Sequence, residues 1–403
     1  MANEPIVALD VGTSHIRAVV GERIDDGGVM VTGMGEEPSC GIRKGEVIDF
    51  ENALTSVKAA LQKAEESANV TIRNCYLLVT GTHISSTVNR GTIPLLDSVG
   101  EVTVADMENV AKAAHNIKLE EGREILHTIN QYYLIDDQTG IVNPEGMEGR
   151  DLALKSLIVH GASNRMRNLA KVVSSVPLDI DDSAFGGLCS ALSVLTPSQK
   201  ESGVLLIDLG GGTTDVVLYA PRYLALAQSI GVGGEHVTND IAIGMKLSHS
   251  QAERLKKSRG SALIDHSLRG QSVALPAEGG FDGRSVRLMD LNTIINARME
   301  ETFRMIRHIC DGEGLLHQLG AGVVLCGGGS YMRDIESLAE EVFRMPASIG
   351  RPRNVSGIDI ATENPEYAGV TGLLRYSLMS NAQAGKSGLG GMIRGLSFGR
   401  GRV

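Results

Sequence analysis

The chain has 403 residues, of which 42% are hydrophobic, and its formal net charge is −10. A chain of this length and hydrophobicity can bury a sizeable core over roughly two to four domains, and it does not belong to the largely disordered class. The acidic balance disfavours nucleic acid as a partner, and no apolar run approaches the roughly 18 residues of a membrane span.

The five cysteines are scattered and include no CxxC pair, so they favour neither a disulfide framework nor a zinc site. The N-terminal segment MANEPIVALD has no basic stretch leading into an apolar one, and therefore does not look like a secretory signal. Together these features predict a cytoplasmic protein with reduced thiols.

The first motif is IVALDVGTSHIRAVVGE, residues 6–22. Apolar residues lead to Asp10, a turn of small residues follows at Gly12, Thr13 and Ser14, and alternation resumes after His15. This pattern predicts a strand, a tight turn and a second strand. Backbone N–H groups at such a turn can hold phosphate oxygens, and a carboxylate at the strand end can hold the water shell of Mg²⁺.

Two helices are predicted before the motif recurs. FENALTSVKAALQKAEESA, residues 50–68, has apolar residues at nearly helical spacing, which predicts a helix with one face in the core. SNRMRNLAKVVSSV, residues 163–176, predicts a second helix with Ser163 or Asn164 as its cap.

The first motif recurs as LLIDLGGGTTDVVLY, residues 205–219. Asp208 ends the apolar run, and glycines at the turn would let the backbone approach an anion closely. An ordinary glycine hairpin explains this stretch alone. Its repetition after about 200 residues indicates two related halves whose hairpins hold one polyphosphate between them. The residues predicted to bind phosphate are Asp10, Gly12, Thr13, Ser14, His15, Asp208, Gly210, Gly211, Gly212, Thr213 and Thr214.

Two helices are predicted in the second half. AERLKKSRGSA, residues 252–262, predicts a helix in which Glu253 and Lys256 share a face, although a solvated ion pair has the same pattern. ARMEETFRMIRHI, residues 297–309, predicts an amphipathic helix with a stripe that faces the core.

A further glycine cluster lies in AGVVLCGGGSYMRDI, residues 321–335. It predicts a strand, a turn at Gly327, Gly328, Gly329 and Ser330, and then the start of a helix. These glycines would let a flat ring or a sugar lie against the backbone, and a plain strand–helix turn is the alternative.

The composition changes after residue 381, where NAQAGKSG is typical of a flexible linker and LGGMIRGLSFGRGRV follows. Apolar residues recur there at helical spacing beside cations, and the segment has no acidic side chain, which predicts weak binding to an anionic membrane surface. A disordered tail is the alternative, because its glycines oppose a helix. The predicted membrane-targeting residues are Leu389, Met392, Ile393, Arg394, Leu396, Phe398, Arg400 and Arg402.

These motifs, in this order, resemble those of the actin-like ATPase superfamily, which includes actins, chaperones and sugar kinases. Residues 10–14 resemble its first phosphate motif, 208–214 its second, and 327–330 its adenosine motif. The resemblance implies an α/β, actin-like (ribonuclease H-like) duplicated fold of two lobes with a nucleotide cleft between them. It also implies ATP and Mg²⁺ as cofactors. Asp10 and Asp208 would hold the metal through water, Glu253 and Lys256 would meet the ribose, and Gly234 would join the site.

Longer segments resemble the FtsA family, the cell-division relatives of actin in bacteria. They are CGIRKGEVIDFENALTSVKAAL, LVTGTHISS, ILHTINQYYLIDDQTGIVNPEGMEGRDL and GEHVTNDIA, and the resemblance covers about residues 5–380. It implies a protein that polymerises on the inner face of the cytoplasmic membrane at the division site. Such a protein anchors the FtsZ ring by binding the FtsZ tail, and recruits other division proteins.

The FtsA resemblance also implies an organisation in seven segments. In chain order these are lobe one with the first phosphate motif (1–82), an FtsA-type inserted subdomain (83–161), the returning helices of lobe one (162–190), the core of lobe two with the second phosphate motif (191–234), its smaller subdomain, which would meet FtsZ (235–298), the rest of that core with the adenosine motif (299–380), and the linker with the basic tail (381–403).

Two positions depart from the superfamily pattern. His15 stands where many relatives have a lysine, and a neutral histidine would bring less positive charge to the phosphates. Active ATPases have Glu or Gln at the start of the first connecting helix, where residues 181–184 here read Asp-Asp-Ser-Ala, so Asp182 is the catalytic candidate. We therefore expect weak or no ATP hydrolysis, with ATP acting as a structural switch.

Other members of the superfamily fit the sequence less well. A small-molecule kinase would need a catalytic carboxylate facing a second substrate, for which the sequence offers no strong candidate. A pilus-assembly relative such as PilM is disfavoured by the basic tail and by the extent of the FtsA-like segments. A chaperone is disfavoured because no separate peptide-binding domain follows the second half.

Overall fold

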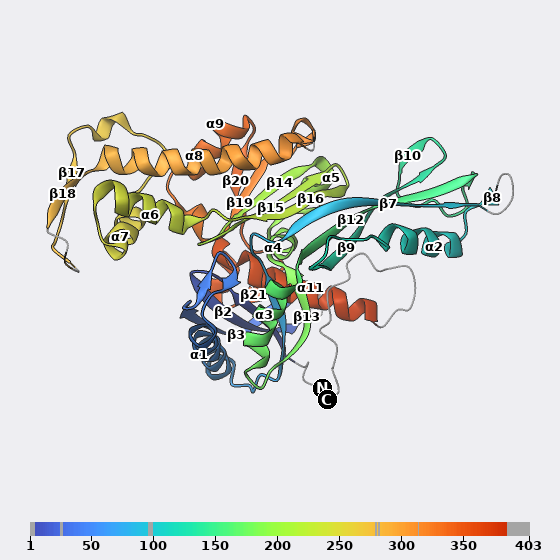
Figure 1. The fold of residues 1–403 in the computed structure, drawn as a ribbon, viewed down its shortest axis with the longest axis horizontal. Coiled ribbons are helices and arrows are strands. Elements are labelled where there is room, and N and C mark those ends of the chain that lie inside the picture. The colour runs from blue at the N-terminus through green and yellow to red at the C-terminus, as the bar shows by residue number, and fades with distance from the viewer. Residues whose placement is uncertain are drawn as a thin grey trace.

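The computed structural model describes residues 5–24, 27–95, 100–278, 280, 283–312 and 314–384. Figure 1 shows a T-shaped molecule, in which lobe one forms the stem and lobe two the middle of the bar. The inserted subdomain and the smaller subdomain of lobe two form the two arms of the bar. The predicted targeting residues, 389–402, lie outside the described part of the chain.

Lobe one is built on a six-stranded sheet in the order β13-β6-β1-β2-β3-β21. The first hairpin is confirmed, because β1 and β2 pair antiparallel up to Val11 and Ile16 and leave residues 12–15 at the tip. Helix α1 lies so close to β3 that a Cβ on Gly35 would overlap the Ala60 carbonyl oxygen. The bounds are β1 (Ile6–Val11), β2 (His15–Arg23), β3 (Val29–Pro38), β4 (Ile42–Arg43), β5 (Glu46–Val47), α1 (Phe50–Ala68), β6 (Asn74–Val79), α3 (Ser163–Ser174), β13 (Asp179–Phe185) and β21 (Val355–Gly357).

Both predicted helices of lobe one are present, as α1 and α3. Asp49 caps α1 by accepting a hydrogen bond from the Asn52 N–H. The predicted cap of α3 is wrong, because the capping position is Ala162 and no side chain bonds to the first turn. The strand before α3 runs to that residue, so Ser163 is already helical.

The inserted subdomain is a four-stranded antiparallel sheet in the order β10-β9-β12-β7, with α2 packed against β7 and β12. A Cβ on Gly91 of β7 would overlap the backbone of Ala114 in α2, so the helix lies directly on the sheet. The bounds are β7 (Ser85–Pro94), β8 (Gly100–Glu101), α2 (Val104–His115), β9 (Arg123–Ile135), β10 (Gln138–Ile141), β11 (Glu148–Gly149) and β12 (Asp151–Ala162).

Lobe two repeats the topology of lobe one. Its five-stranded sheet has the order β16-β15-β14-β19-β20, in which β14–β15 is an antiparallel hairpin and β19 and β20 are parallel additions. This matches β3-β2-β1-β6-β13 of lobe one strand for strand. The two related halves inferred from the repeated motif are therefore confirmed. The bounds are α5 (Pro197–Ser202), β14 (Val204–Leu209), β15 (Thr214–Ala220), β16 (Tyr223–Ile230), β19 (Val323–Cys326), α9 (Ile335–Phe343) and β20 (Ala347–Ile349). Helix α10 (Asp359–Glu363) comes later in the chain and packs on lobe one, where it contacts β21.

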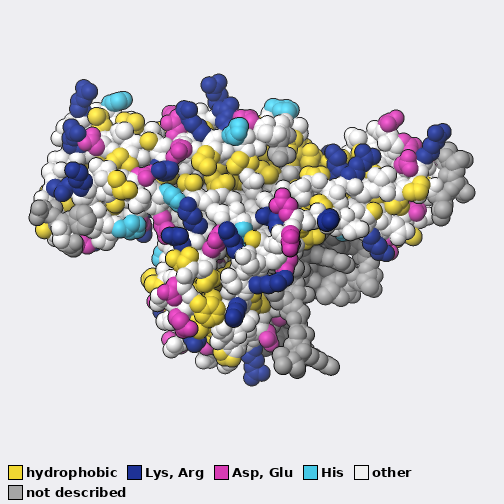
Figure 2. Space-filling model, in the orientation of Figure 1, with side chains coloured by type: hydrophobic (Ala, Val, Ile, Leu, Met, Phe, Trp, Pro, Cys, Tyr) yellow, Lys and Arg dark blue, Asp and Glu magenta, His cyan; other side chains and the backbone are white. Residues whose placement is uncertain are grey.

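The smaller subdomain of lobe two contains α6 (Gly234–Met245), α7 (His249–Arg259) and the hairpin β17 (Ser272–Leu275) with β18 (Arg284–Arg287). Figure 2 shows Lys and Arg side chains standing out on this arm, at the left of the view. Helix α8 (Leu288–Gly312) is 25 residues long and runs from this arm over the core of lobe two. The helix predicted over 297–309 is its second half, so the predicted segment boundary at 298 falls inside a continuous helix.

Helix α4 (Gly186–Val194) follows β13 of lobe one and leads toward lobe two, and α11 (Ala368–Ala384) packs on α4 and on the sheet of lobe one. The backbones of the two helices are in direct contact at Gly372, because a Cβ on this residue would overlap the carbonyl oxygen of Cys189. The hydroxyls of Ser193 and Thr371 are hydrogen-bonded at 2.9 Å across the same interface. One hydrophobic cluster includes Leu9 and Leu77 of lobe one, Leu188 of α4, and Val204 and Leu206 of lobe two, so the two lobes share a core at the base of the cleft. Among the described residues no helix has the length and apolarity needed to cross a membrane.

Candidate functional site

A cavity of about 760 Å³ opens between the two lobes. Its walls come from both hairpin tips, the turn after β19, the start of α6, helix α7, and the segment that leads into α11. The predicted residues that line it are Asp10, Gly12, Thr13, Ser14, His15, Asp208, Gly210, Gly211, Gly212, Thr213, Thr214, Gly234, Glu253, Lys256, Gly327, Gly328 and Gly329. Residues from three distant parts of the sequence thus meet at one site.

The two hairpin tips face each other across the floor of the cavity. A Cβ on Gly212 would lie 2.6 Å from Thr13 Oγ1, and one on Gly211 would lie 3.0 Å from Ser14 Cβ. The second tip is closed by the Gly210 N–H, which donates to the Thr213 carbonyl oxygen at 3.0 Å. Glycine is therefore needed here for close approach of the two loops.

Three aspartates lie under the hairpin tips, and sequence reasoning found only two of them. Burial raises the pKa of Asp10 to about 6, although Arg17 opposes the rise. Burial also raises the pKa of Asp208, although a hydrogen bond from Ser190 opposes the rise. Asp215 was missed; burial and then the charge of Asp208 raise its pKa to about 7. The hairpin register could have identified Asp215, because Asp208 and Asp215 are directly opposite each other in the β14–β15 ladder.

The corresponding pair in lobe one has opposite charges. Asp10 stands opposite Arg17 in the β1–β2 ladder, at the position equivalent to Asp208 and Asp215 in lobe two. Among the described residues no group of three or more His, Cys, Asp or Glu side chains is arranged to hold a metal ion directly. Burial disfavours the ionised form of these carboxylates. A divalent cation held nearby through its water shell would stabilise the ionised form, so the residues fit such a cation.

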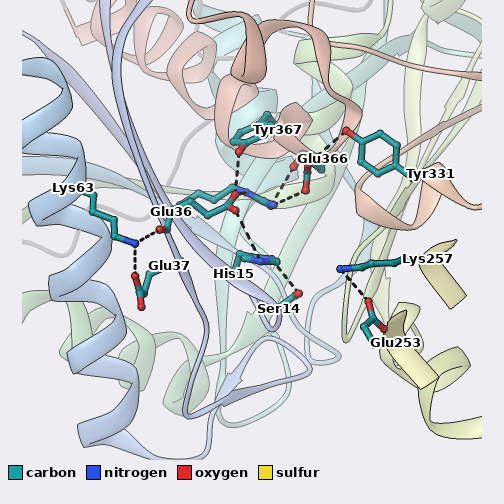
Figure 3. Close-up of polar contacts among 11 residues, drawn as sticks. Ser14, His15, Glu36, Glu37, Lys63, Glu253, Lys257, Tyr331, Glu366 and Tyr367 are labelled. Atoms are coloured by element: carbon teal, nitrogen blue, oxygen red, sulfur yellow. Dashed lines mark hydrogen bonds and ion pairs between the residues drawn. The ribbon is translucent and has the colours of Figure 1, made fainter. Parts of the chain in front are cut away.

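The first hairpin carries His15 beside Ser14 and Glu36 (Figure 3). His15 Nδ1 lies 3.1 Å from Ser14 Oγ, and His15 Nε2 lies 3.9 Å from Glu36 Oε1. Burial first and the charge of Arg17 second lower the pKa of His15. A neutral imidazole at pH 7 agrees with the reduced positive charge expected from the replacement of lysine.

The Glu253–Lys256 pair on α7 is not a solvated surface pair. Lys256 Nζ lies 2.7 Å from Glu253 Oε2 and also donates to the Gly234 carbonyl and to Thr238 Oγ1, and its side chain is 12% exposed. Although burial alone would raise the pKa of Glu253, hydrogen bonds from Lys256 and Thr238 lower it to about 2. The carboxylate is thus ionised and held in place at the cavity wall.

The turn after β19 differs from its prediction at its end. Gly327 has φ +79°, which favours glycine, and a Cβ there would overlap a carboxylate oxygen of Asp208. A Cβ on Gly328 would meet nothing within 4 Å, so this backbone is open to the cavity. Ser330 does not line the cavity, because it is buried and its Oγ donates to the Gly327 carbonyl at 2.7 Å. Helix α9 begins only at Ile335, after a 3₁₀ turn over 328–331.

Asp182 does not line the cavity. The placement of residues 181–184 at the start of a helix is wrong, because they belong to β13, which pairs in parallel with β6 as far as Phe185. Asp182 accepts a hydrogen bond from the Tyr376 hydroxyl at 2.9 Å and another from the Ser183 N–H at 2.8 Å. The first residue of α4 is Gly186, so neither the Glu nor the Gln of the superfamily pattern stands at the start of this helix.

Several other cavity residues could not be found from the motifs. Arg17 lies on β2 of lobe one, and Glu366 lies just before α11. Tyr331 ends the glycine turn of lobe two. Arg17 and Tyr331 lie within the motif segments 6–22 and 321–335, whose patterns mark no role for them, and Glu366 lies outside both segments. The proximity of Arg17 and Glu366 depends on the packing of elements 349 residues apart in the chain.

Comparison with known proteins gives a consistent family. A family model described as "Cell division protein FtsA" matches residues 205–372, and one described as "SHS2 domain inserted in FTSA" matches residues 81–160. The cell division protein FtsA of Pseudomonas aeruginosa is 36% identical over 377 residues, which cover 94% of this chain and 90% of that protein. FtsA of Escherichia coli K12 is 34% identical over 383 residues, covering 93% and 91%.

Solved structures agree in fold. The PilM–PilN type IV pilus biogenesis complex gives a TM-score of 0.62 at 14% identity, covering 93% of this chain and 98% of the other. MreB5 of Spiroplasma citri bound to ADP gives 0.59 at 14% identity, covering 95% and 99%. These likenesses confirm the actin-like fold, whereas the likeness in sequence and the inserted subdomain are those of cell-division proteins. The chain therefore belongs to the FtsA family of actin-like cell-division proteins.

Proposed function

We propose that this chain binds ATP with Mg²⁺, polymerises on the inner face of the cytoplasmic membrane at the division site, and anchors the FtsZ ring there. The observation that carries the proposal is that one cavity receives both hairpin tips, the turn at Gly327 and the Glu253–Lys256 pair. The smaller subdomain of lobe two would bind the FtsZ tail, and the basic tail would bind anionic lipid. Copies of the chain and other division proteins would be its further partners.

Each wall of the cavity would hold a different part of the nucleotide. Backbone N–H groups of the two tips would hold phosphate oxygens, the Glu253–Lys256 pair would hold the ribose, and the open backbone at Gly328 would face the base. Asp10 and Asp208 would hold Mg²⁺ through water, and the metal would supply positive charge beside the phosphates. Because α4 begins with Gly186 instead of a carboxylate, we propose that ATP is hydrolysed slowly or not at all.

Nucleotide binding is expected to depend on Lys256 and on Mg²⁺. A fluorescent ATP analogue titrated into the full chain should bind with Mg²⁺ and lose most of its affinity in EDTA. Lys256→Met should weaken binding about 10- to 100-fold, because hydrogen bonds to a charged group are worth about 1.5–3 kcal/mol. Lys58→Met, at an exposed position on α1, is the matched control and should bind normally. Equal binding by K256M and wild type would contradict the proposed ribose contact.

Membrane attachment is expected to depend on the tail and on polymerisation. The full chain with ATP should co-sediment with vesicles that contain anionic lipid, and a chain cut after Asn381 should stay in solution. Vesicles of neutral lipid should retain less of the full chain, because the tail cations lose their partners. If the cut chain pellets equally well, the tail is not the anchor.

A further inference from the structure

A buried arginine joins two elements at the wall of the cavity. Arg17 on β2 has a side chain that is 10% exposed. Its Nε donates to Glu36 Oε2 at 2.6 Å, its Nη2 donates to Glu366 Oε2 at 2.6 Å, and its guanidinium lies 4.8 Å from the centre of the Tyr367 ring. Figure 3 shows the two acids at this site, Glu36 with the Tyr367 hydroxyl and Glu366 with the Tyr331 hydroxyl. The guanidinium is therefore held by two carboxylates from different elements, and each of these charge-assisted hydrogen bonds helps to fix its position.

Glu366 also belongs to a junction with lobe two. Tyr331, in the 3₁₀ turn after Gly327, donates its hydroxyl to Glu366 Oε1 at 3.5 Å. In the same segment the Gly327 N–H donates to the Pro365 carbonyl oxygen at 3.0 Å. The short turn at 365–367 therefore contacts the glycine turn of lobe two on one side and Arg17 of lobe one on the other.

The same group reaches the first hairpin tip. Arg17 is two residues from His15 on β2, and Glu36 lies near both side chains. Arg17, Glu366, Tyr331 and Gly327 all line the cavity. A ligand that contacts the glycine turn would thus be connected to the phosphate hairpin through Tyr331, Glu366 and Arg17.

We propose that Arg17, acting through Glu366, is a positioning residue that couples the phosphate hairpin of lobe one to the glycine turn of lobe two. When the nucleoside part of a ligand orders residues 327–331, Glu366 and Arg17 hold residues 11–16 in the geometry that receives phosphate. The coupling rests on the proposed ATP site. It adds that binding of the nucleoside part raises the affinity of the first hairpin for the phosphates.

Adenosine is the probe that isolates this coupling, because it lacks phosphates and cannot contact the first hairpin through them. In the wild-type full chain, adenosine should slow amide hydrogen exchange in both segments, 327–332 and 11–16. In Glu366→Gln it should slow exchange in 327–332 only. The affinity of E366Q for Mg²⁺–ATP should fall about five-fold or more, the lower range of coupling energies between sites. Glu363→Gln changes an exposed acid on α10 and should behave as wild type.

The outcomes separate the coupling from the nucleotide site itself. If wild type does not bind Mg²⁺–ATP, the proposed function fails. If wild type binds it, and adenosine protects residues 11–16 equally in wild type and E366Q or in neither, the coupling alone is overturned. If E366Q does not fold, Tyr331→Phe replaces it; this side chain is 53% exposed and its hydroxyl is the link to Glu366. Y331F should reduce protection of residues 11–16 without reducing that of 327–332, and equal protection would refute the coupling.

Discussion

Gly372→Ala is expected to destabilise the chain by about 3 kcal/mol, the upper range for an added group in a packed core. The new methyl group would overlap the Cys189 carbonyl oxygen, which is backbone and cannot turn aside. Helices α4 and α11 would have to separate, and the contact between the Ser193 and Thr371 hydroxyls lies in the same interface. The loss should exceed the gain of about 1 kcal/mol that alanine brings to a helix interior.

Urea denaturation followed by circular dichroism would measure this change. Gly312→Ala, at the end of α8, is the matched control, because a Cβ there meets nothing within 4 Å. We expect G312A to be as stable as wild type or slightly more stable. If G372A were equally stable, the close crossing of the two helices would not be a feature of the folded protein.

Asp215→Asn is expected to stabilise the ligand-free protein at pH 8. Burial and the neighbouring Asp208 raise the pKa of Asp215 from 3.8 to about 7 in the folded state. The folded state therefore binds more protons than the unfolded state between these values. The stability linked to this proton is fully present below pH 3.8 and is lost as the pH rises to about 7.

Asparagine is always neutral, so D215N avoids this loss. The stability gained over wild type should grow from pH 5 to pH 8 by on the order of 2 kcal/mol, at about 1.4 kcal/mol for each pKa unit. Thermal denaturation at both pH values would measure it. Asp179→Asn, an exposed acid on β13, is the control and should show no such trend. If D215N is less stable than wild type at pH 8, the ionised Asp215 side chain does not destabilise the folded protein, and the prediction is wrong.

Sequence reasoning found the local features and missed those set by packing. Both hairpins and the turn at Gly327 follow from apolar runs that end in small residues, which is local information. The position of Asp182 depends on the parallel pairing of β13 with β6, about 100 residues earlier in the chain, and no local pattern marks it. Asp215 could have been found, because a hairpin with residues 210–213 at its tip places it opposite Asp208. The pairing of Arg17 with Glu366 joins positions 349 residues apart and is beyond any motif.

The two hairpins share a topology but not a charge pattern, and this difference gives the cleft a polarity. Lobe one has an acid opposite a base, Asp10 and Arg17, where lobe two has two acids, Asp208 and Asp215. Two identical halves would offer an elongated anion two equivalent orientations related by a half-turn. Unequal charges at equivalent positions make the two orientations unequal in energy. A cation bound to one end of the anion would favour the half with two acids. A duplicated scaffold that binds such an anion would thereby distinguish one end of the anion from the other.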